Sequence, residues 1–495
     1  MKRLTTKFVV LLLVLGAARV GMAFSLLGPF KAYQVQGIGY ALPGDIGGPM
    51  TLGEGYRWNL PTITYAYDQS FIDYFGSNGI VAVDAAVKIL NDLPPFSQIT
   101  NDASSLYING LRVPTDNYHL NYEAQALGLA DLKSTALVLL LEELGLAEPE
   151  RWVWALRGRA TVTAGGVTFT NYSVIKLNYD PITRQSSSYV NGALYTYTIL
   201  DPIGRLMYAD AIEFSADKLA FEFSSVAGGG GTSGLFAAFF GSAGTTNFFI
   251  RTTAGRFYTG LTHDDVGGLR FLYSTNNLAT ELLLPDVIGG VPLGGGSPWT
   301  PYFVQTNFFA TGSNFTFSAN AAGTNLIVQG LRPGINKVKF QRVNFDSLIG
   351  QSFVAVTNLY TDTIITNGRP LIQPVQRIVT RPDIVFVAGD LGLLGDNLTP
   401  VSMRRSDTSQ WQNNDAINGN IAQGGPGVIT PQVTIFLTDQ YPYFINRFPN
   451  FISEVNFFNQ SAVWASYDGT TNAPILYPAY GTLTLDDLRS LALTK

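Results

Sequence analysis

The chain contains no cysteine in 495 residues and only two histidines, His119 and His263. Without cysteine it has no disulfides, thiol catalysis, iron–sulfur cluster or thiolate zinc site, so stability must come from the size of its core. Two histidines also cannot supply a zinc site built from three. A chain of this length is expected to form roughly two to four domains.

Charge is scarce as well. Charged residues make up 14% of the chain, against about 25% in an ordinary globular protein, and the net charge is −5. No run rich in lysine and arginine occurs, which argues against nucleic acid or an anionic membrane as the main partner. Aromatic residues reach 13% and glycine numbers 51. This composition suits exported β-rich proteins, which use aromatic side chains for recognition.

The N-terminus has the pattern of a secretory signal peptide. Lys2, Arg3 and Lys7 precede an apolar run, and small residues follow it at cleavage spacing. We expect cleavage after Ala23 and a mature protein that is secreted or held in the cell envelope. The run is about half of the roughly 20 residues that a spanning helix needs, and no later stretch approaches that length without glycine, proline or charge. We therefore expect no membrane span after cleavage.

Two helices are predicted in the first 150 residues. The first has apolar residues at three- and four-residue steps, begins at Ser77 or Asn78, and ends before a pair of prolines. The second covers residues 131–145, where Asp131 caps the start and Gly145 terminates the end. Its surface is apolar on most sides, which predicts that it is buried.

A third helix is predicted over residues 261–274, in the stretch LTHDDVGGLRFLYS. Thr262 precedes Asp265 by three residues, the spacing of a capping box. Asp264 and Asp265 look like paired catalytic acids, but the first turn of a helix favours carboxylates for capping. We interpret His263, in the same turn, as a residue that faces solvent.

After residue 280 the sequence pattern changes. It predicts strands separated by glycine, proline and asparagine, at the spacing of a β-sandwich. We predict a signal peptide over 1–23 and an α+β front domain over 24–280, with a mixed sheet and three helices. All-β, sandwich-like domains follow over 281–400 and 401–495, and the chain ends in a short helix.

The front half resembles the matrixin-type metzincins. RWNLPTITYAYD, the first predicted helix and LTHDDVGGLRFLYS are similar to the opening strand, first helix and closing helix of that family, over roughly residues 55–275. Met207 and Tyr208 resemble the turn beneath the family's zinc. The chain also looks like uncharacterised exported bacterial proteins with a degenerate matrixin-like domain, which share ITYAYD, DDVGGLR and GLRPG. The resemblance implies a metzincin-like fold for residues 24–280.

The same resemblance implies a zinc helix of the form His-Glu-x-x-His-x-x-Gly-x-x-His. In the best candidate, VLLLEELGLAE, Gly145 matches the family's glycine. Val138 stands at the first ligand, Leu139 at the general base, and Glu142 and Glu148 at the other two ligands. Two carboxylates without imidazole bind zinc weakly, and no residue remains to activate water. We therefore predict no catalytic, metal-binding or cofactor-binding residue.

Other chemistry finds little support. Glu142 and Glu143 point about 100° apart on a helix and cannot flank one glycosidic bond, which leaves a salt-bridged or exposed pair. His119 lacks the nucleophile elbow of a serine hydrolase, which favours a structural role. Oxygen-rich turns at 413–420 and 467–472 leave structural calcium as the one open cofactor, although plain β-turns are favoured.

We therefore expect a secreted or cell-envelope structural or binding protein without a catalytic zinc site, whose β modules serve adhesion or assembly. Its partner is an extracellular protein or glycan surface, or another copy of the chain. One alternative is a secreted metal-dependent hydrolase or peptidase that uses Glu142 and Glu148 as ligands. Another is a carbohydrate-binding module protein with a coplanar row of tyrosine or tryptophan.

Overall fold

The computed structural model describes about three fifths of the chain, and the statements below concern these residues. They are 23–30, 47–102, 105–108, 111–112, 115–116, 119–147, 149–190, 192–200, 210–215, 254–289, 316–319, 325–345, 353–388, 405–406, 410–413, 426–437 and 463–493. Residues 1–22 of the predicted signal peptide (1–23), Glu148, Met207, Tyr208 and residues 414–420 lie outside them. Within the described part, no helix is long and apolar enough to cross a membrane.

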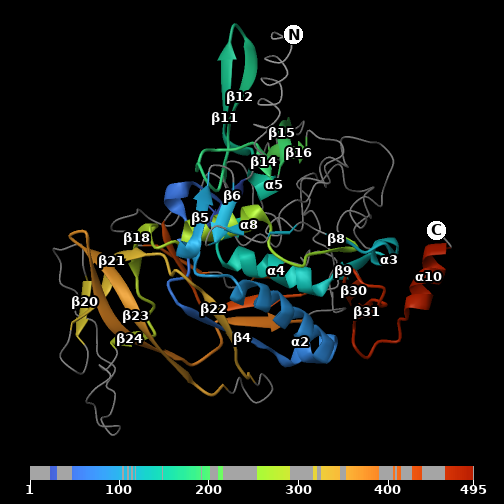
Figure 1. Ribbon diagram of the computed structural model, residues 1–495. Coiled ribbons are helices and arrows are strands. Elements are labelled where there is room, and N and C mark those ends of the chain that lie inside the picture. The colour runs from blue at the N-terminus through green and yellow to red at the C-terminus, as the bar shows by residue number, and fades with distance from the viewer. Residues whose placement is uncertain are drawn as a thin grey trace, which may run out of the picture.

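A five-stranded sheet lies at the centre of the molecule (Figure 1). Four of its strands are parallel and one edge strand is antiparallel. The strands come from all three predicted domains, which the boundaries at 280 and 400 separate. One hydrophobic core therefore crosses both boundaries. In order across the sheet they are β22 (Lys339–Arg342), β4 (Thr62–Tyr67), β25 (Ile384–Val387), β29 (Val433–Phe436) and the antiparallel β26 (Arg405–Ser406).

The long helix α2 (Gln69–Asn91) follows β4 and contacts the central sheet as well as a second helix. It begins at Asp68, whose carboxylate accepts a hydrogen bond from the backbone N–H of Phe71 at 2.9 Å. The sequence missed this first segment, whereas the predicted start at Ser77 or Asn78 coincides with the break that separates it from the rest of the helix. Gly76 adopts φ +60 inside the helix and marks a kink, and the apolar pattern read from the sequence belongs to the part beyond that kink.

The second helix, α4 (Leu132–Glu143), confirms its prediction at both ends. Asp131 accepts a hydrogen bond from the Ser134 N–H at 2.9 Å. Past the other end, Gly145 has φ +93, and a Cβ there would lie 2.3 Å from the carbonyl oxygen of Tyr56, so only glycine fits. The helix is buried along nearly its whole length, as its apolar surface predicted.

The third helix, α8 (His263–Tyr273), begins with the predicted capping box. The backbone N–H of Thr262 donates to Asp265 at 2.8 Å, and the Asp265 N–H donates to the Thr262 hydroxyl at 3.3 Å. The prediction that His263 faces solvent was wrong, because the residue is only 5% exposed. The first turn of α8 packs into the core together with its polar side chains.

Many short strands form further small sheets around this core. They are β1 (Phe24–Gly28) with β2 (Gly48–Met50), β10 (Leu146–Ala147) and β13 (Asn178–Tyr179); β3 (Tyr56–Arg57) with β28 (Gly427–Thr430) and β27 (Gln410–Asn413); β9 (Leu129–Asp131) with β30 (Val463–Ser466) and β31 (Ile475–Leu476); β8 (His119–Leu120) with β17 (Arg256–Phe257); β5 (Ile99–Asp102), β6 (Ser105–Ile108) and β7 (Leu111–Arg112); and β14 (Tyr189–Val190), β15 (Ala193–Leu200) and β16 (Asp210–Ser215). The remaining helices are α3 (Tyr122–Ala126), α5 (Pro149–Trp152) and α10 (Leu485–Leu493). The described fold is thus mixed α/β, with few helices and many short strands.

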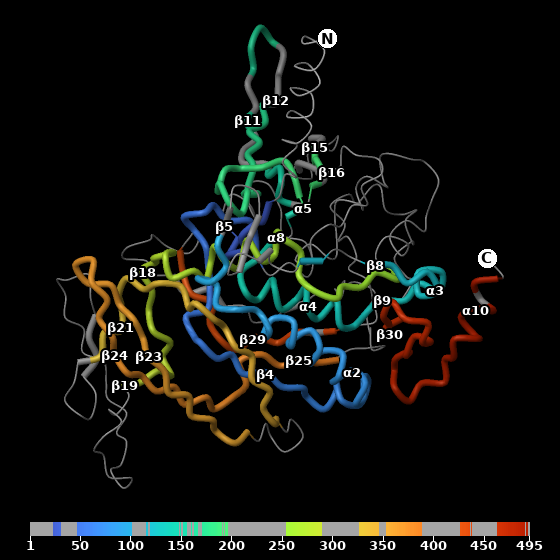
Figure 2. Tube along the Cα trace, in the orientation of Figure 1, coloured from blue at the N-terminus to red at the C-terminus, as the bar shows by residue number. Residues whose placement is uncertain are grey.

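Two three-stranded sheets pack at one end of the molecule, on the left in Figure 2. Strand β21 of one sheet contacts strand β23 of the other. The first sheet contains β18 (Leu278–Leu282), β21 (Asn325–Pro333) and β20 (Thr316–Ala319); the second contains β19 (Val287–Gly289), β24 (Arg369–Val379) and β23 (Val356–Thr366).

A long hairpin of β11 (Ala155–Ala164) and β12 (Val167–Ile175) extends away from the body at the top of Figure 1. Gly165 and Gly166 form its turn with φ of +61 and +81. Two successive positive φ values are those of a type I′ turn, which matches the twist of a two-residue hairpin.

Candidate functional site

The candidate zinc helix lies inside a filled core. Val138 and Leu139, at the positions of the first ligand and the general base, are each 3% exposed and belong to the main hydrophobic cluster. Helix α4 packs against α2 and against strands β9, β10 and β30. The described residues contain no group of three or more side chains able to hold a metal ion. The helix therefore presents aliphatic carbon where a metallopeptidase presents ligands.

Glu142 and Glu143 end the same helix and are buried, with exposures of 9% and 2%. The sequence predicted a salt-bridged or exposed pair. The predicted exposure was wrong, because both side chains are buried. The backbone carbonyl of Glu143 accepts a hydrogen bond from Trp58 Nε1 at 2.6 Å, and that of Glu142 accepts one from the Gly145 N–H at 2.9 Å. Both residues thus belong to the packed end of the helix.

A polar cluster begins α4. The carboxylate of Asp131 accepts hydrogen bonds from the N–H and the hydroxyl of Ser134. The same hydroxyl oxygen accepts a hydrogen bond from the Tyr258 N–H at 2.9 Å. Ser134 is thus engaged both as donor and as acceptor, and it ties the start of α4 to the segment after β17.

Burial raises the pKa of the Asp131 carboxyl, and hydrogen bonds from Ser134 oppose this shift. Burial penalises the ionised form, which hydrogen bonds only partly offset. The carboxyl therefore retains its proton to a higher pH in the folded protein than in the unfolded chain.

Replacing Asp131 with asparagine is expected to change how stability depends on pH. With a raised folded pKa, the native protein loses stability as the pH rises from the unfolded value, near 3.9, to the folded value. Asparagine keeps a capping oxygen but does not titrate. The free energy of unfolding of Asp131→Asn minus that of the native protein should therefore rise as the pH increases above about 4. Urea unfolding at several pH values measures this difference.

Asp487 provides the matched control, because it caps an exposed helix. Hydrogen bonds from Thr484 lower its pKa, so it stabilises the fold as a carboxylate. For Asp487→Asn, the same difference should fall slightly as the pH rises. A difference that also falls with pH for Asp131→Asn would contradict the burial of an uncharged acid at the start of α4.

His119 lies in an exposed cluster with Asp116 and Thr259. Its Nε2 is 2.8 Å from Asp116 Oδ2 and 3.5 Å from Thr259 Oγ1, and the threonine hydroxyl also donates to Asp116. The ring stacks on Phe257 with 5.3 Å between centroids. A nucleophile–histidine–acid relay needs the acid and the hydroxyl on opposite ring nitrogens. Here both meet the same nitrogen, so the geometry does not form such a relay.

Asp264 and Asp265 do not act as a pair. Asp265 turns back to cap Thr262, whereas Asp264 is fully buried with Oδ1 at 3.9 Å from Nδ1 of His263. The two carboxylates thus serve different neighbours, as the capping interpretation predicted for Asp265.

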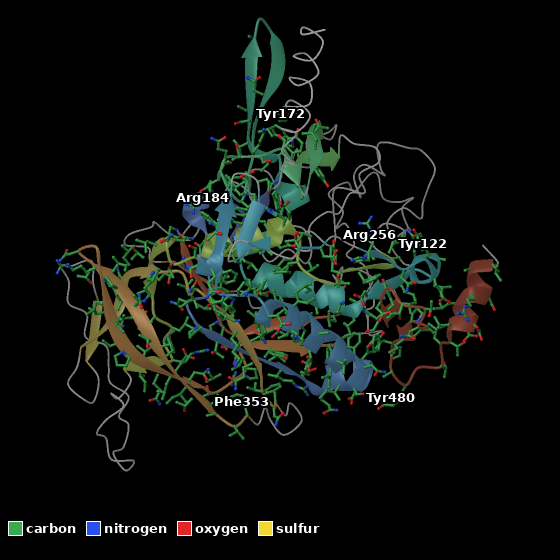
Figure 3. All side chains as sticks on the ribbon, in the orientation of Figure 1. Tyr122, Tyr172, Arg184, Arg256, Phe353 and Tyr480 are labelled. Atoms are coloured by element: carbon green, nitrogen blue, oxygen red, sulfur yellow. The ribbon has the colours of Figure 1, made fainter. Side chains whose placement is uncertain are left out.

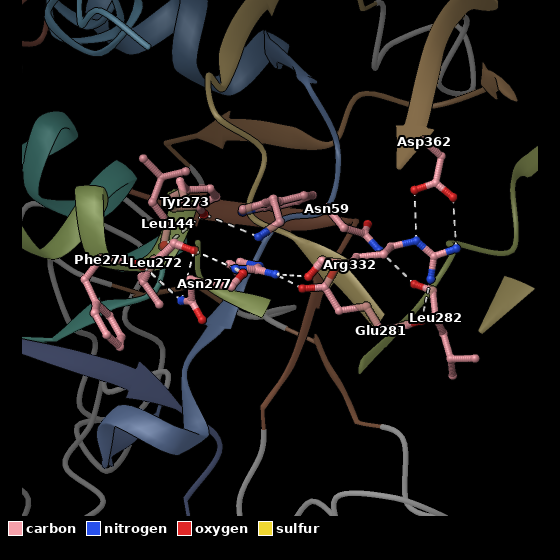
Figure 4. A network of polar contacts seen from close by, with 12 residues as sticks. Asn59, Leu144, Phe271, Leu272, Tyr273, Asn277, Glu281, Leu282, Arg332 and Asp362 are labelled. Carbon is pink, nitrogen blue, oxygen red and sulfur yellow. Dashed lines mark hydrogen bonds and ion pairs between the residues drawn. The ribbon is translucent and has the colours of Figure 1, made fainter. Parts of the chain in front are cut away.

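The structure also contains a buried ionic network that the sequence did not indicate (Figure 4). Arg57 donates from Nε to Glu281 Oε1 at 2.7 Å and from its terminal nitrogens to three backbone carbonyl oxygens. Arg332 donates two hydrogen bonds to Asp362, at 2.9 and 3.0 Å. Burial raises the pKa of Glu281, and the charge of Arg57 opposes the shift. The network joins β3 and α8 to the two three-stranded sheets at the end of the molecule, which contain β21 and β23.

A second cluster of charged side chains joins strand β24, in one of these three-stranded sheets, to the central sheet. Arg377 donates to both carboxylate oxygens of Asp383, at 3.0 and 2.6 Å, and to Asp286 at 2.7 Å. Asp383 also accepts hydrogen bonds from the N–H and the hydroxyl of Thr64 in β4, both at 2.8 Å. Both clusters hold several elements together, and the first reaches the end of the candidate zinc helix, where the Tyr273 hydroxyl donates to the Leu144 carbonyl oxygen at 3.0 Å.

The turn at 467–472 is satisfied by its own hydrogen bonds. Asp468 accepts from the N–H of Thr470 at 2.9 Å and from its hydroxyl. These hydrogen bonds hold the pKa of Asp468 below its usual range. The arrangement is that of an Asx-turn, which supports the interpretation of a plain turn.

No protein-family model matches this chain, and neither a curated protein nor a solved structure is similar to it. Function is therefore inferred from the packing and chemistry of the described residues.

Proposed function

We propose that this chain is an exported structural or binding protein whose front half is a matrixin-like scaffold without a metal centre. One observation carries the proposal: the helix that aligns with the zinc helix is enclosed by core, with Val138 and Leu139 buried at the decisive positions. A zinc peptidase needs an open cleft beside this helix and side chains with electron pairs at these positions. Aliphatic side chains supply neither.

The finer fold assignment is part of the proposal. Strand β4 and helices α2 and α8, which carry the resemblance to metzincins, contribute with α4 to a single hydrophobic cluster. A metzincin-like domain requires such a shared core. The contact between the sheets of β21 and β23 supports a sandwich-like unit within residues 281–400.

A binding role is supported by apolar side chains on the outer hairpin of β23 and β24. Val354, just before this hairpin, is 85% exposed, while Leu359 and Ile372 are 61% and 63% exposed. Exposed apolar side chains that gather on one element are characteristic of recognition surfaces. The proposed partners are an extracellular protein or glycan surface, or another copy of the chain.

The test is metal analysis of the mature protein after gentle purification, together with peptidase assays with and without a chelator. We expect zinc far below one ion per chain and no chelator-sensitive activity. Glu142→Gln is the matched variant, because it removes the one described carboxylate of the alternative metal site. Stoichiometric zinc that is lost in Glu142→Gln, with activity that a chelator abolishes, would replace this proposal with a divergent metal-dependent peptidase.

A further inference from the structure

We propose that the outer face of the β23–β24 hairpin packs against the same face of a second copy of this chain. The inference rests on the proposed function, because it names the partner of the exposed apolar surface on this hairpin. Three properties of the face support it: its apolar side chains, its lack of charge and a register that suits two-fold pairing.

The hairpin has an inner and an outer face, and all of it lies within the described residues 353–388. Successive side chains of a strand point to opposite faces. On the inner face, which contacts β21, Asp362 is buried and Tyr360 packs against the main hydrophobic cluster. Leu359 and Thr361 alternate with these residues and therefore point outward.

The outer face is largely apolar. Leu359 and Ile372 are 61% and 63% exposed, and Figure 3 shows Phe353, three residues before β23, at the lower side of the molecule. Exposed apolar side chains that gather on one element mark interaction sites. The antiparallel register gives the face five pairs of neighbours: Thr357 with Ile378, Leu359 with Gln376, Thr361 with Pro374, Thr363 with Ile372, and Ile365 with Pro370. All of them except Gln376 are exposed or half-buried.

None of these ten described side chains is charged. The one exposed charged residue within 356–379 is Arg369 in the turn, because Asp362 and Arg377 are buried. Nucleic acid or anionic lipid would require basic side chains. A carbohydrate-binding face would require a row of tyrosine or tryptophan, which the ten positions lack. A second copy presents the same uncharged face, so the contact buries no unpaired charge.

The register also suits a two-fold contact, in which the same patch serves both copies. Sheets that pack face to face lie about 10 Å apart and interdigitate their side chains. An axis that crosses both strands at the pair of Thr361 and Pro374 reverses the order of the pairs. Leu359 of one copy then lies at the level of Ile372 of the other. The exposed aliphatic side chains thus meet twice, once in each half of the contact.

The size of the face predicts a weak association. Two strands of 11 residues, at about 3.3 Å per residue and about 4.8 Å apart, cover roughly 36 by 10 Å, or about 700 Å² for the two copies together. Interfaces below about 1,200 Å² belong to weak, transient complexes. We therefore expect a reversible dimer in the micromolar range that persists at high salt, because no charges hold it together.

Sedimentation velocity of the mature chain over a micromolar concentration series tests the contact. Leu359→Glu and Ile372→Lys each place a charge on the face, and the fold should tolerate both because these side chains are exposed. Val81→Glu is the matched control, because Val81 is an aliphatic residue on α2 that is 66% exposed.

We expect the mature chain and Val81→Glu to form the same dimer at about 0.1 M and about 1 M salt. Each face variant alone should associate about tenfold more weakly, because its dimer buries two unpaired charges. An equimolar mixture of the two face variants should recover most of the association, because the glutamate of one copy then lies at the level of the lysine of the other.

A mature chain that stays monomeric at all concentrations assigns the face to a different partner and overturns the proposal. Face variants that associate as tightly as the mature chain overturn it as well. A mixture that associates no more tightly than its components overturns the two-fold arrangement. None of these results affects the metal analysis, which tests the proposed function separately.

Discussion

Replacing Leu139 with glutamate will lower the free energy of unfolding by about 3–5 kcal/mol, because it places an unpaired carboxylate in a closed core. Leu139 is 3% exposed on the inner surface of α4. In an active metallopeptidase this position carries the glutamate that activates water beside an open cleft. The substitution thus introduces the glutamate of those enzymes at a place where a buried charge has no partner. Urea-induced unfolding at neutral pH measures the loss.

Leu139→Met is the matched control, since it keeps the volume and polarity of the site and should cost less than about 1.5 kcal/mol. The glutamate variant should regain stability as the pH falls, because a buried carboxyl is tolerated when protonated. Equal unfolding of the two variants would mean that α4 borders water, and the alternative peptidase hypothesis would then regain its main requirement.

Replacing Arg57 with methionine should also destabilise the fold by about 3–5 kcal/mol, because it leaves a buried charge without its partner. The Arg57 side chain is 2% exposed and that of Glu281 is 1% exposed. The loss of Arg57 also leaves the carbonyl oxygens of Leu272, Asn277 and Arg332 without these donors. Buried acceptors without a hydrogen bond destabilise the folded state. Guanidinium-induced unfolding, followed by tryptophan fluorescence, gives the change.

Arg342→Met tests whether burial causes this effect. Arg342 pairs with Asp84 at 2.9 Å, but the two side chains are 46% and 33% exposed, so its removal should cost less than about 1 kcal/mol. The double variant Arg57→Met with Glu281→Leu should recover part of the stability, because it removes the unpaired acid as well. Similar losses for Arg57→Met and Arg342→Met would show that the inner network contributes no more than a surface ion pair.

The sequence predicted those features that depend on neighbours along the chain. Asp131 and Gly145 mark the ends of α4, and Thr262 with Asp265 caps α8, because caps involve residues within a few positions of one another. Thr484 likewise caps the last helix through Asp487. The burial of α4 could also be predicted, since its apolar residues cover most of its surface.

Features that depend on distant partners could not be predicted in this way. Glu281, the partner of Arg57, lies 224 positions away, and Thr64 and Asp383 are 319 positions apart. Local patterns carry no signal for such pairs. The prediction that His263 is exposed was wrong for the same reason, because the packing of α8 against other elements decides whether this side chain is buried. The arginine between the aromatic residues Tyr56 and Trp58 was the one available signal of the network.

The position of β4 between β22 and β25 in the central sheet has a consequence for biogenesis. Its two neighbours in the sheet, β22 and β25, begin at Lys339 and Ile384, so β4 cannot complete its pairing in this sheet until these later stretches have been made. Pairings this remote are slow to form, since a long loop must close before any contact rewards it. For a polypeptide that we propose to be exported, the central sheet is therefore completed only after most of the chain has been translocated.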